Sequence, residues 1–163
     1  MVLKTKLLNA ENIYLHKIIH NTIQLLEVEL TKKDISLVST IEKDLPALIV
    51  NQNEITLLIK NLLSNAIQFN KTGGKIFIDV IRVKNFISIG IKDTGIGIRQ
   101  EELIKIFKEY YRIKNNRMRG IRVINHGLTI VKRIVDSYHG KVEVESAFGE
   151  GTTVTINLPI NTN

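Results

Sequence analysis

One carboxylate and three carboxamides are the side chains in this sequence whose types and spacing could do chemistry. Asp93 ends a segment of alternating apolar and polar residues, 86–92, and is followed by Gly95 and Gly97. A carboxylate at the end of such a strand can accept a hydrogen bond from an exocyclic amine, and two glycines let the backbone lie against a flat ring. The carboxamide oxygens suit a hard cation such as Mg²⁺. These carboxamides occur at helical spacing i, i+4 and i+7, as Asn61, Asn65 and Gln68.

The elements that must position these side chains can be predicted from hydrophobic periodicity. Residues 52–70 have apolar side chains at core spacing, so they predict a helix with the carboxamides in a stripe beside the core. Alternation predicts strands at 35–41, 75–83 and 86–92, and a short strand within 45–50. We also expect Val142 and Val144 to pair with Val154 and Ile156 across a turn at 147–151.

Three further helices are predicted. One runs from Glu11 to Lys33, with Asn9 or Asn12 as its N-cap, and a short one runs from 100 to 108. The last begins near residue 128 and ends at Gly140, a glycine in the C′ position. This mixed order of helices and strands predicts an α+β fold, a two-layer sandwich with the helices on one face of the sheet.

Five motifs stand in the order found in the ATP-binding catalytic domain of sensor histidine kinases, which this chain resembles from about residue 9 to 159. That domain belongs to the superfamily of gyrase, heat-shock protein 90 and the mismatch-repair ATPases. Asn61–Ala66 is similar to the N box, and Asp93–Gly97 to the first glycine box. Glu102–Phe107 with Tyr110–Arg112 is similar to the F box. Gly127–Lys132 is similar to the end of the second glycine box, and Gly149–Thr153 to the closing hairpin.

The resemblance implies a Bergerat-type fold, with a mixed sheet of about five strands and ATP bound between the helices and a lid. It implies that Asp93 accepts a hydrogen bond from the adenine amine, that Asn65 is the Mg²⁺ ligand, and that Asn61 is the catalytic polar residue near the phosphates. It also implies nucleotide-binding roles for Gln68, Gly95, Gly97, Ile98, Tyr111, Arg112, Gly127, Leu128 and Thr152. Taken alone, an aspartate after a strand and a threonine within one are also ordinary structural features.

The sequence departs from the family pattern at the phosphate end of the site. Gln68 stands where the family often has a lysine, which removes one charge-assisted contact. Val123 and Asn125 stand where the second glycine box normally has glycines, whose backbone N–H groups can close around phosphate. These changes leave open whether ATP binds with an altered lid or binds poorly.

The net charge of +7 is concentrated in residues 104–122, which contain seven basic residues and one acidic residue. Such a segment can be a solvated loop, or it can bind nucleic acid or an anionic membrane surface. Few aromatic residues are interleaved with the charges, so a nucleic-acid groove is not expected. The position between the F box and second glycine box favours a lid, residues 112–126, over nucleotide phosphates.

Composition limits the remaining possibilities. A chain of 163 residues is large enough for one core. It contains no cysteine, which excludes disulfides and thiolate metal sites and fits a cytoplasmic protein. No apolar run approaches the roughly 18 residues of a membrane span, so we expect no membrane segment here, although a full-length protein could be membrane-anchored. No P-loop sequence is present.

We expect residues 1–33 to be an N-terminal helical segment, formed by the tail of a dimerisation domain and the first helix of the catalytic domain. Residues 34–163 are then the ATP-binding catalytic domain. Neither His16 nor His20 is followed by an acidic residue, as the family's phosphoacceptor is. The acceptor histidine is therefore expected on a separate dimerisation domain, with a response regulator as an indirect partner.

The predicted function is transfer of the ATP γ-phosphoryl group to that histidine in two-component signal transduction. Two alternatives remain open from the sequence: a degenerate, non-catalytic nucleotide-binding or interaction domain, and a serine kinase of the anti-sigma type.

Overall fold

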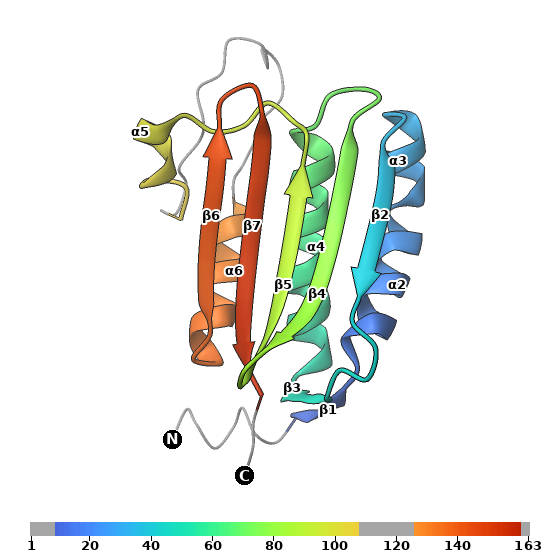
Figure 1. Cartoon of the computed structure of the whole chain (residues 1–163), viewed down its shortest axis with the longest axis vertical. Coiled ribbons are helices and arrows are strands. Elements are labelled where there is room, and N and C mark those ends of the chain that lie inside the picture. The colour runs from blue at the N-terminus through green and yellow to red at the C-terminus, as the bar shows by residue number, and fades with distance from the viewer. Residues whose placement is uncertain (1–8, 108–125, 161–163) are drawn as a thin grey trace.

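The computed structural model describes residues 9–107 and 126–160. Five strands form its main sheet, in the spatial order β2-β4-β5-β7-β6 (Figure 1). β2 pairs parallel with β4, and the other neighbours are antiparallel. The predicted pairs Val142–Ile156 and Val144–Val154 are both present. The strands are β2 (Ser36–Ile41), β4 (Lys75–Val83), β5 (Phe86–Asp93), β6 (Lys141–Ala147) and β7 (Gly151–Pro159).

Three helices cover one face of this sheet: α2 (Leu15–Leu25), α4 (Gln52–Gln68) and α6 (His126–Ser137) (Figure 1). The core lies between the two layers, because every second residue of the central strands points towards the helices. The predicted two-layer α+β sandwich is therefore confirmed. The buried strand residues include Ile76, Ile78 and Val80 of β4 and Ile87, Ile89 and Ile91 of β5.

Helix α4 is fixed at both of its ends. At its start, Asn51 Oδ1 accepts hydrogen bonds from the N–H groups of Asn53 (2.9 Å) and Glu54 (3.2 Å), which is an N-cap. At its end, Lys33 Nζ donates to the carbonyl oxygens of Ile67 (2.8 Å) and Gln68 (2.7 Å). An ammonium group suits the negative end of a helix dipole. The carboxamide side chains of α4 therefore project from a well-anchored helix.

The prediction of one helix from Glu11 to Lys33 is wrong. Residues 11–13 form β1 (Glu11–Ile13), which pairs antiparallel with β3 (Leu48–Val50). The helical part is divided at Leu26 into α2 and α3 (Glu27–Lys32), and neither predicted N-cap is used, since Tyr14 precedes α2 without a side-chain cap. Pairing with a strand far along the chain outweighs local helical periodicity here. Residues 11–33 share one hydrophobic core with the sheet.

The C-terminal end of α6 differs from the prediction in one residue. His139, and not Gly140, has the left-handed conformation, with φ of 58°. The N–H of Gly140 donates to the carbonyl of Val135 (3.0 Å) and that of His139 to Asp136 (3.0 Å), which together make a Schellman motif. Gly140 is needed for another reason, because a Cβ there would lie 2.5 Å from the carbonyl oxygen of Asn157 in β7. The other short helix, α5 (Gln100–Leu103), ends earlier than predicted.

Tyr138 joins the end of α6 to the start of α4. Its hydroxyl oxygen accepts a hydrogen bond from the N–H of Asn51 (3.0 Å) and donates to the carboxylate of Glu54. Burial, and then the hydrogen bond to Glu54, raise the pKa of Tyr138 to about 12 from 10.0. The two neighbouring helices of this layer, α4 and α6, are therefore connected through one phenol.

We expect Tyr138→Phe to lower the free energy of unfolding by about 1–2 kcal/mol at neutral pH, because a backbone N–H and a carboxylate lose their partner. The raised pKa favours the neutral phenol in the folded state. Its stabilisation is therefore fully present below pH 10.0 and is lost as the pH rises through about 12. Urea unfolding should show the difference between wild type and variant shrinking over this interval. A difference that stays constant with pH would contradict the proposed role of the Tyr138 hydroxyl. Tyr14→Phe, at a half-exposed tyrosine, is the control.

Candidate functional site

Three polar side chains stand in one row across the end of the sheet. The register pairs Asp93 of β5 with Thr152 of β7, and Thr152 with Ser146 of β6. Asp93 follows Ile91 on the face of β5 that packs against the helices, so the whole row points towards the helix layer. The sheet therefore presents a carboxylate and two hydroxyls side by side.

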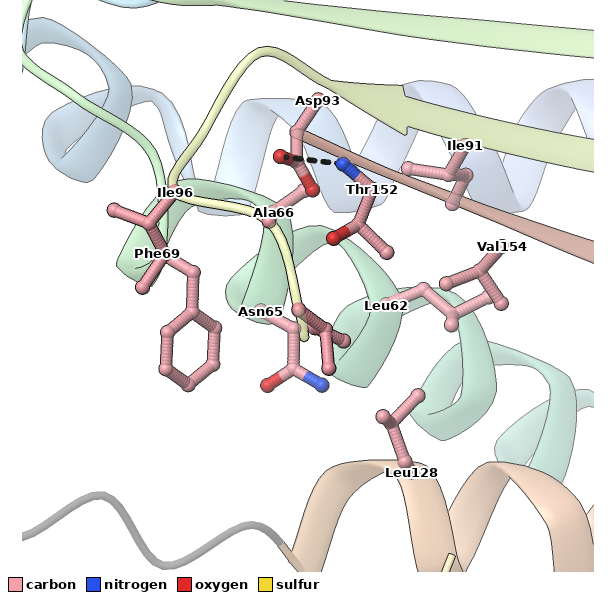
Figure 2. A pocket seen from close by; sticks show the side chains of 12 residues that line it. Leu62, Asn65, Ala66, Phe69, Ile91, Asp93, Ile96, Leu128, Thr152 and Val154 are labelled. Carbon is pink, nitrogen blue, oxygen red and sulfur yellow. Dashed lines mark hydrogen bonds between the residues drawn. The ribbon is translucent and has the colours of Figure 1, made fainter. Parts of the chain in front are cut away.

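Asp93 is buried, with 7% of its surface exposed. Its Oδ1 accepts a hydrogen bond from the N–H of Gly95 (2.8 Å). The same oxygen accepts a second hydrogen bond from the N–H of Thr152 (3.3 Å), which Figure 2 shows. Within residues 9–107 and 126–160, no donor contacts Oδ2. Burial raises the pKa of Asp93, and the two backbone hydrogen bonds partly offset that rise. The site thus holds a buried acceptor oxygen that can serve a ligand.

The backbone after Asp93 turns so tightly that it requires glycine. A Cβ on Gly95 would lie 2.2 Å from the carbonyl oxygen of Phe69, at the end of α4. Gly97 has φ of 67°, and a Cβ there would lie 2.0 Å from the carbonyl oxygen of Ala147. Hydrogen bonds hold this loop between α4 and the β6–β7 turn, from the N–H of Ile96 to Phe69 (3.0 Å) and from that of Gly149 to Ile96 (2.7 Å).

A pocket opens between the Asp93 row, α4 and the first turn of α6 (Figure 2). Its polar lining consists of Asp93, Thr152 and Asn65, and most of the remaining lining is apolar. Apolar walls with a few polar groups at one end suit a flat heteroaromatic ring that has polar atoms on one edge. The apolar side chains are those of Leu62, Ala66, Phe69, Ile91, Ile96, Ile98, Leu128 and Val154.

Asn61 and Asn65 meet the N-terminal turn of α6. A Cβ on Gly127 would lie 3.2 Å from Asn61 Oδ1 and 3.2 Å from Asn65 Nδ2, so glycine permits this close approach. Asn61 Nδ2 donates to the carbonyl oxygen of Leu57 (2.8 Å), which turns its oxygen away from its own helix. Carboxamide oxygens beside the positive end of a helix dipole can serve a cation and the anion bound to it.

The predicted site residues are thus only partly brought together. Asn65, Asp93, Gly97, Ile98, Leu128 and Thr152 line the pocket, whereas Asn61, Gly95 and Gly127 are not among its lining residues. Gly95 lies in the tight turn after Asp93, and Asn61 and Gly127 lie beside each other next to Asn65. Gln68 is not among the lining residues, and its carbonyl oxygen serves Lys33. Tyr111, Arg112 and most of the predicted lid lie outside the described residues, so their roles stay predictions.

Sequence reasoning missed Ser146. Its Oγ lies 2.8 Å from Thr152 Oγ1, and it accepts a hydrogen bond from the N–H of Ile98 (2.8 Å). A signal was available, because the predicted pairing of Val144 with Val154, continued by two residues, places Ser146 opposite Thr152. Phe69 and Ile96 of the pocket wall carry no comparable signal, since Phe69 lies beyond the segment similar to the N box and Ile96 is an apolar residue between two glycines.

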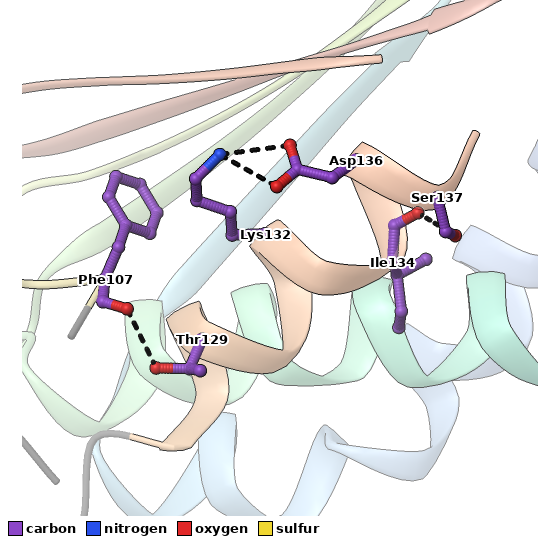
Figure 3. A network of polar contacts seen from close by, with 6 residues as sticks. All are labelled: Phe107, Thr129, Lys132, Ile134, Asp136 and Ser137. Atoms are coloured by element: carbon purple, nitrogen blue, oxygen red, sulfur yellow. Dashed lines mark hydrogen bonds and ion pairs between the residues drawn. The ribbon is translucent and has the colours of Figure 1, made fainter. Parts of the chain in front are cut away.

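The segment similar to the F box packs against α6. Ile106 is fully buried, and the carbonyl oxygen of Phe107 accepts a hydrogen bond from Thr129 Oγ1 (3.3 Å) (Figure 3). The same view shows the ion pair of Lys132 and Asp136 (3.0 Å) one turn further along the exposed side of α6. This hydrogen bond holds Phe107, at the end of the described segment 9–107, against the first turn of α6.

Two classes of site are not found in the described part of the chain. Residues 9–107 and 126–160 contain no group of three His, Cys, Asp or Glu side chains that could hold a metal ion. In the same residues, every helix is too short or too polar to cross a bilayer.

Comparison with known proteins agrees with this geometry. Residues 50–162 match the family model of the histidine kinase-, DNA gyrase B- and HSP90-like ATPases. The sensor histidine kinase WalK of Bacillus subtilis (strain 168) is 35% identical over 112 residues, which are 68% of this chain and 18% of WalK. The sensor histidine kinase RppB of Synechocystis sp. is 36% identical over 110 residues, which are 68% of this chain and 24% of RppB.

Solved structures share the fold at lower identity. The catalytic domain of histidine kinase ThkA superposes with a TM-score of 0.79 at 22% identity, covering 93% of this chain and 97% of that domain. Full-length ShkA superposes with a TM-score of 0.82 at 18% identity, covering 95% of this chain and 32% of ShkA. The chain therefore corresponds to one domain of longer proteins, and it spans about a fifth to a quarter of the two curated relatives. It belongs to the family of histidine kinase-, DNA gyrase B- and HSP90-like ATPases, and those relatives are sensor histidine kinases.

Proposed function

We propose that this chain is the ATP-binding catalytic domain of a sensor histidine kinase. It transfers the γ-phosphoryl group of ATP, bound with Mg²⁺, to a histidine on a separate dimerisation domain. The names of WalK and RppB support the activity, and ShkA, which shares the fold, was solved in complex with AMPPNP, an ATP analogue. A cytoplasmic location follows from the proposal, because ATP is the phosphoryl donor.

The observation that carries this proposal is the buried carboxylate of Asp93 at the end of an apolar pocket. Its Oδ1 is used by two backbone N–H groups, and its Oδ2 is available to a ligand donor. An adenine ring offers an exocyclic amine to that oxygen and two flat faces to apolar walls such as Ile98 and Leu128. The residues present therefore fit an adenine nucleotide.

The other end of the pocket fits phosphates and a divalent cation. Asn65 would hold Mg²⁺ through its amide oxygen, and Asn61 would contact the phosphates one helical turn earlier. The start of α6 lies beside Asn61 and Asn65, and the backbone N–H groups and dipole of a helix N-terminus favour anions. When bound, Mg²⁺ supplies charge neutralisation for the transferring phosphoryl group.

The chain itself contributes positioning and electrostatics to the transfer. The acceptor imidazole nitrogen forms a bond to the γ-phosphorus while the bond from that phosphorus to the β–γ bridging oxygen breaks, and ADP leaves. Asp93 and the apolar walls hold the base, whereas Asn61, Asn65 and the start of α6 hold the phosphate end. Such alignment is the main source of rate enhancement in phosphoryl transfer.

A response regulator is the indirect partner, since the phosphohistidine would pass its phosphoryl group onward. ThkA, which shares the fold, was solved in complex with the response regulator TrrA. This partner belongs to the proposal for the full-length protein.

The experiment that tests the function has two parts. Titration with a fluorescent ADP in the presence of Mg²⁺ should show saturable binding that ATP competes. Incubation with labelled ATP and a histidine-bearing dimerisation domain of a relative such as WalK should transfer label to that histidine, in an acid-labile and alkali-stable linkage. Binding without transfer would favour a non-catalytic nucleotide-binding domain, and label on serine would favour the anti-sigma-type kinase.

Asp93→Asn is expected to weaken adenine-nucleotide binding by at least about tenfold, because the amide nitrogen would face the adenine amine as a second donor. The fold should be retained, since the amide oxygen can still accept from Gly95 and Thr152. Isothermal titration, with circular dichroism as the check on folding, measures both effects. An unchanged dissociation constant would show that Asp93 does not bind the adenine amine.

The raised pKa of Asp93 adds a dependence on pH to the same prediction. Only the carboxylate can accept at both oxygens, so wild-type affinity for ADP should fall as the pH drops through the folded-state pKa, above the ordinary value for aspartate. The Asp93→Asn variant should not show this decline.

Asn65→Ala is expected to reduce the affinity for Mg²⁺-ATP by about tenfold or more while changing the affinity for metal-free ATP by less than about threefold. The substitution removes a metal ligand and leaves the base end of the pocket intact. Titrations in Mg²⁺ and in EDTA give the two values, and Asn53→Ala, at an exposed position on the same helix, is the matched control. Equal losses under both conditions would show that Asn65 has a structural role.

A further inference from the structure

The hydroxyl of Ser146 stands at the centre of a small hydrogen-bond network behind the pocket. Its Oγ lies 2.7 Å from the carbonyl oxygen of Gly151, 2.8 Å from the backbone nitrogen of Ile98, and 2.8 Å from Thr152 Oγ1. The carbonyl can only accept and the N–H can only donate. Only in the contact between the hydroxyls of Ser146 and Thr152 could either group be the donor.

Counting protons settles the direction of that contact. If the Ser146 proton goes to the Gly151 carbonyl, Ser146 Oγ still accepts from Ile98 and from the Thr152 hydroxyl, so three hydrogen bonds form. If the Ser146 proton goes to Thr152 instead, the Gly151 carbonyl loses this donor and only two bonds form. Because leaving a partly buried polar group without its partner is unfavourable, the first arrangement is preferred.

We propose that Ser146 is a positioning residue that fixes the direction of the Thr152 hydroxyl proton, so that Thr152 faces the pocket as a hydrogen-bond acceptor only. The polar end of the pocket then presents acceptor oxygens alone, from Asp93 Oδ2 and Thr152 Oγ1. It selects a purine with an exocyclic amine and disfavours a purine with a carbonyl at the same position. This inference rests on the proposed binding of ATP and adds the physical basis of its base preference.

The register explains why this device depends on Ser146 and not on Asp93 alone. Thr152 stands between the two in the cross-strand row, with its backbone N–H donating to Asp93 Oδ1 and its side chain contacting Ser146. Without Ser146 the threonine hydroxyl could rotate and donate to a ligand carbonyl. When Thr152 donates to Ser146, it cannot also donate a hydrogen bond to the ring nitrogen beside the amine. That nitrogen would be contacted through a water molecule, which can donate two hydrogen bonds.

The test compares the dissociation constants of ATP and ITP, in which a carbonyl replaces the amine. Ser146→Ala should narrow the preference for ATP over ITP by about 3- to 10-fold, because the released threonine hydroxyl can donate to the inosine carbonyl. A purely structural role for Ser146 would weaken both nucleotides alike. Gln100→Ala is the matched control: it removes a hydrogen bond to the Ser146 carbonyl oxygen (2.9 Å), loosens the same loop, and should leave the ratio unchanged.

Thr152→Val keeps the test decisive even if Ser146→Ala does not fold. An acceptor-only threonine repels the inosine carbonyl, so its removal should narrow the preference for ATP. A threonine that donates would help ITP, so its removal should widen that preference. The double variant should show the same ratio as Thr152→Val alone, because Ser146 acts through Thr152, and Ser146→Thr, which keeps the hydroxyl, should keep the wild-type ratio.

The outcomes separate this inference from the proposed function. A wild-type chain that binds no ATP overturns the proposed function and the inference together. A chain that binds ATP, but whose ratio is unchanged in Ser146→Ala or is widened in Thr152→Val, overturns the role of Ser146 and leaves the proposed function standing.

Discussion

Burial of the Asp93 carboxylate is the constraint on which the rest of the site depends. A buried carboxylate is unfavourable unless hydrogen bonds replace the water it loses. Asp93 receives them from the backbone of Gly95, which requires the chain to turn back at once, and from Thr152, which requires β7 to lie beside β5 in one register. This chain reversal requires glycine at position 95, because the carbonyl of Phe69 leaves no room for a Cβ. One side chain thus sets conditions on two strands and the end of α4.

The two ends of the pocket have opposite electrostatic character. At the sheet end, acceptor oxygens and a buried carboxylate favour a ligand donor. At the helix end, the start of α6 meets Asn61 and Asn65, where the dipole favours an anion and the amide oxygens favour a cation. A ligand with an amine-bearing ring and a metal-bound phosphate chain matches both ends. Hydrogen bonds of Asn51 and Lys33 anchor the two ends of α4, the helix that lines both ends of the pocket.

Local patterns predicted the main sheet far better than they predicted the N-terminal segment. The alternation in β4 and β5 and the pairing of β6 with β7 follow from side chains on one buried face, so the sequence contains that information directly. The residues of β1 were predicted as the start of a helix because a local pattern cannot show their pairing with β3, which is far away in sequence. The left-handed position at the end of α6 was predicted at Gly140, because such a residue is usually glycine, whereas the structure has it at His139 and needs the glycine at 140 for close packing on β7. Ser146 could have been found only by extending a predicted register beyond its apolar residues.

The row of Asp93, Thr152 and Ser146 also contains a group whose burial is energetically unfavourable, the Asp93 carboxylate. Burial raises the pKa of Asp93, which means that folding disfavours the charged form of this residue. An apolar residue at the end of β5 would fit the pattern of Ile87, Ile89 and Ile91 and would need neither the tight turn nor the partner N–H groups. Positions at which a sequence breaks its own local pattern and then supports the break with specific contacts are the expected location of function. Here the contacts reach through Thr152 to Ser146, so the support extends across three strands and ends at a hydroxyl that has no place in the pocket lining.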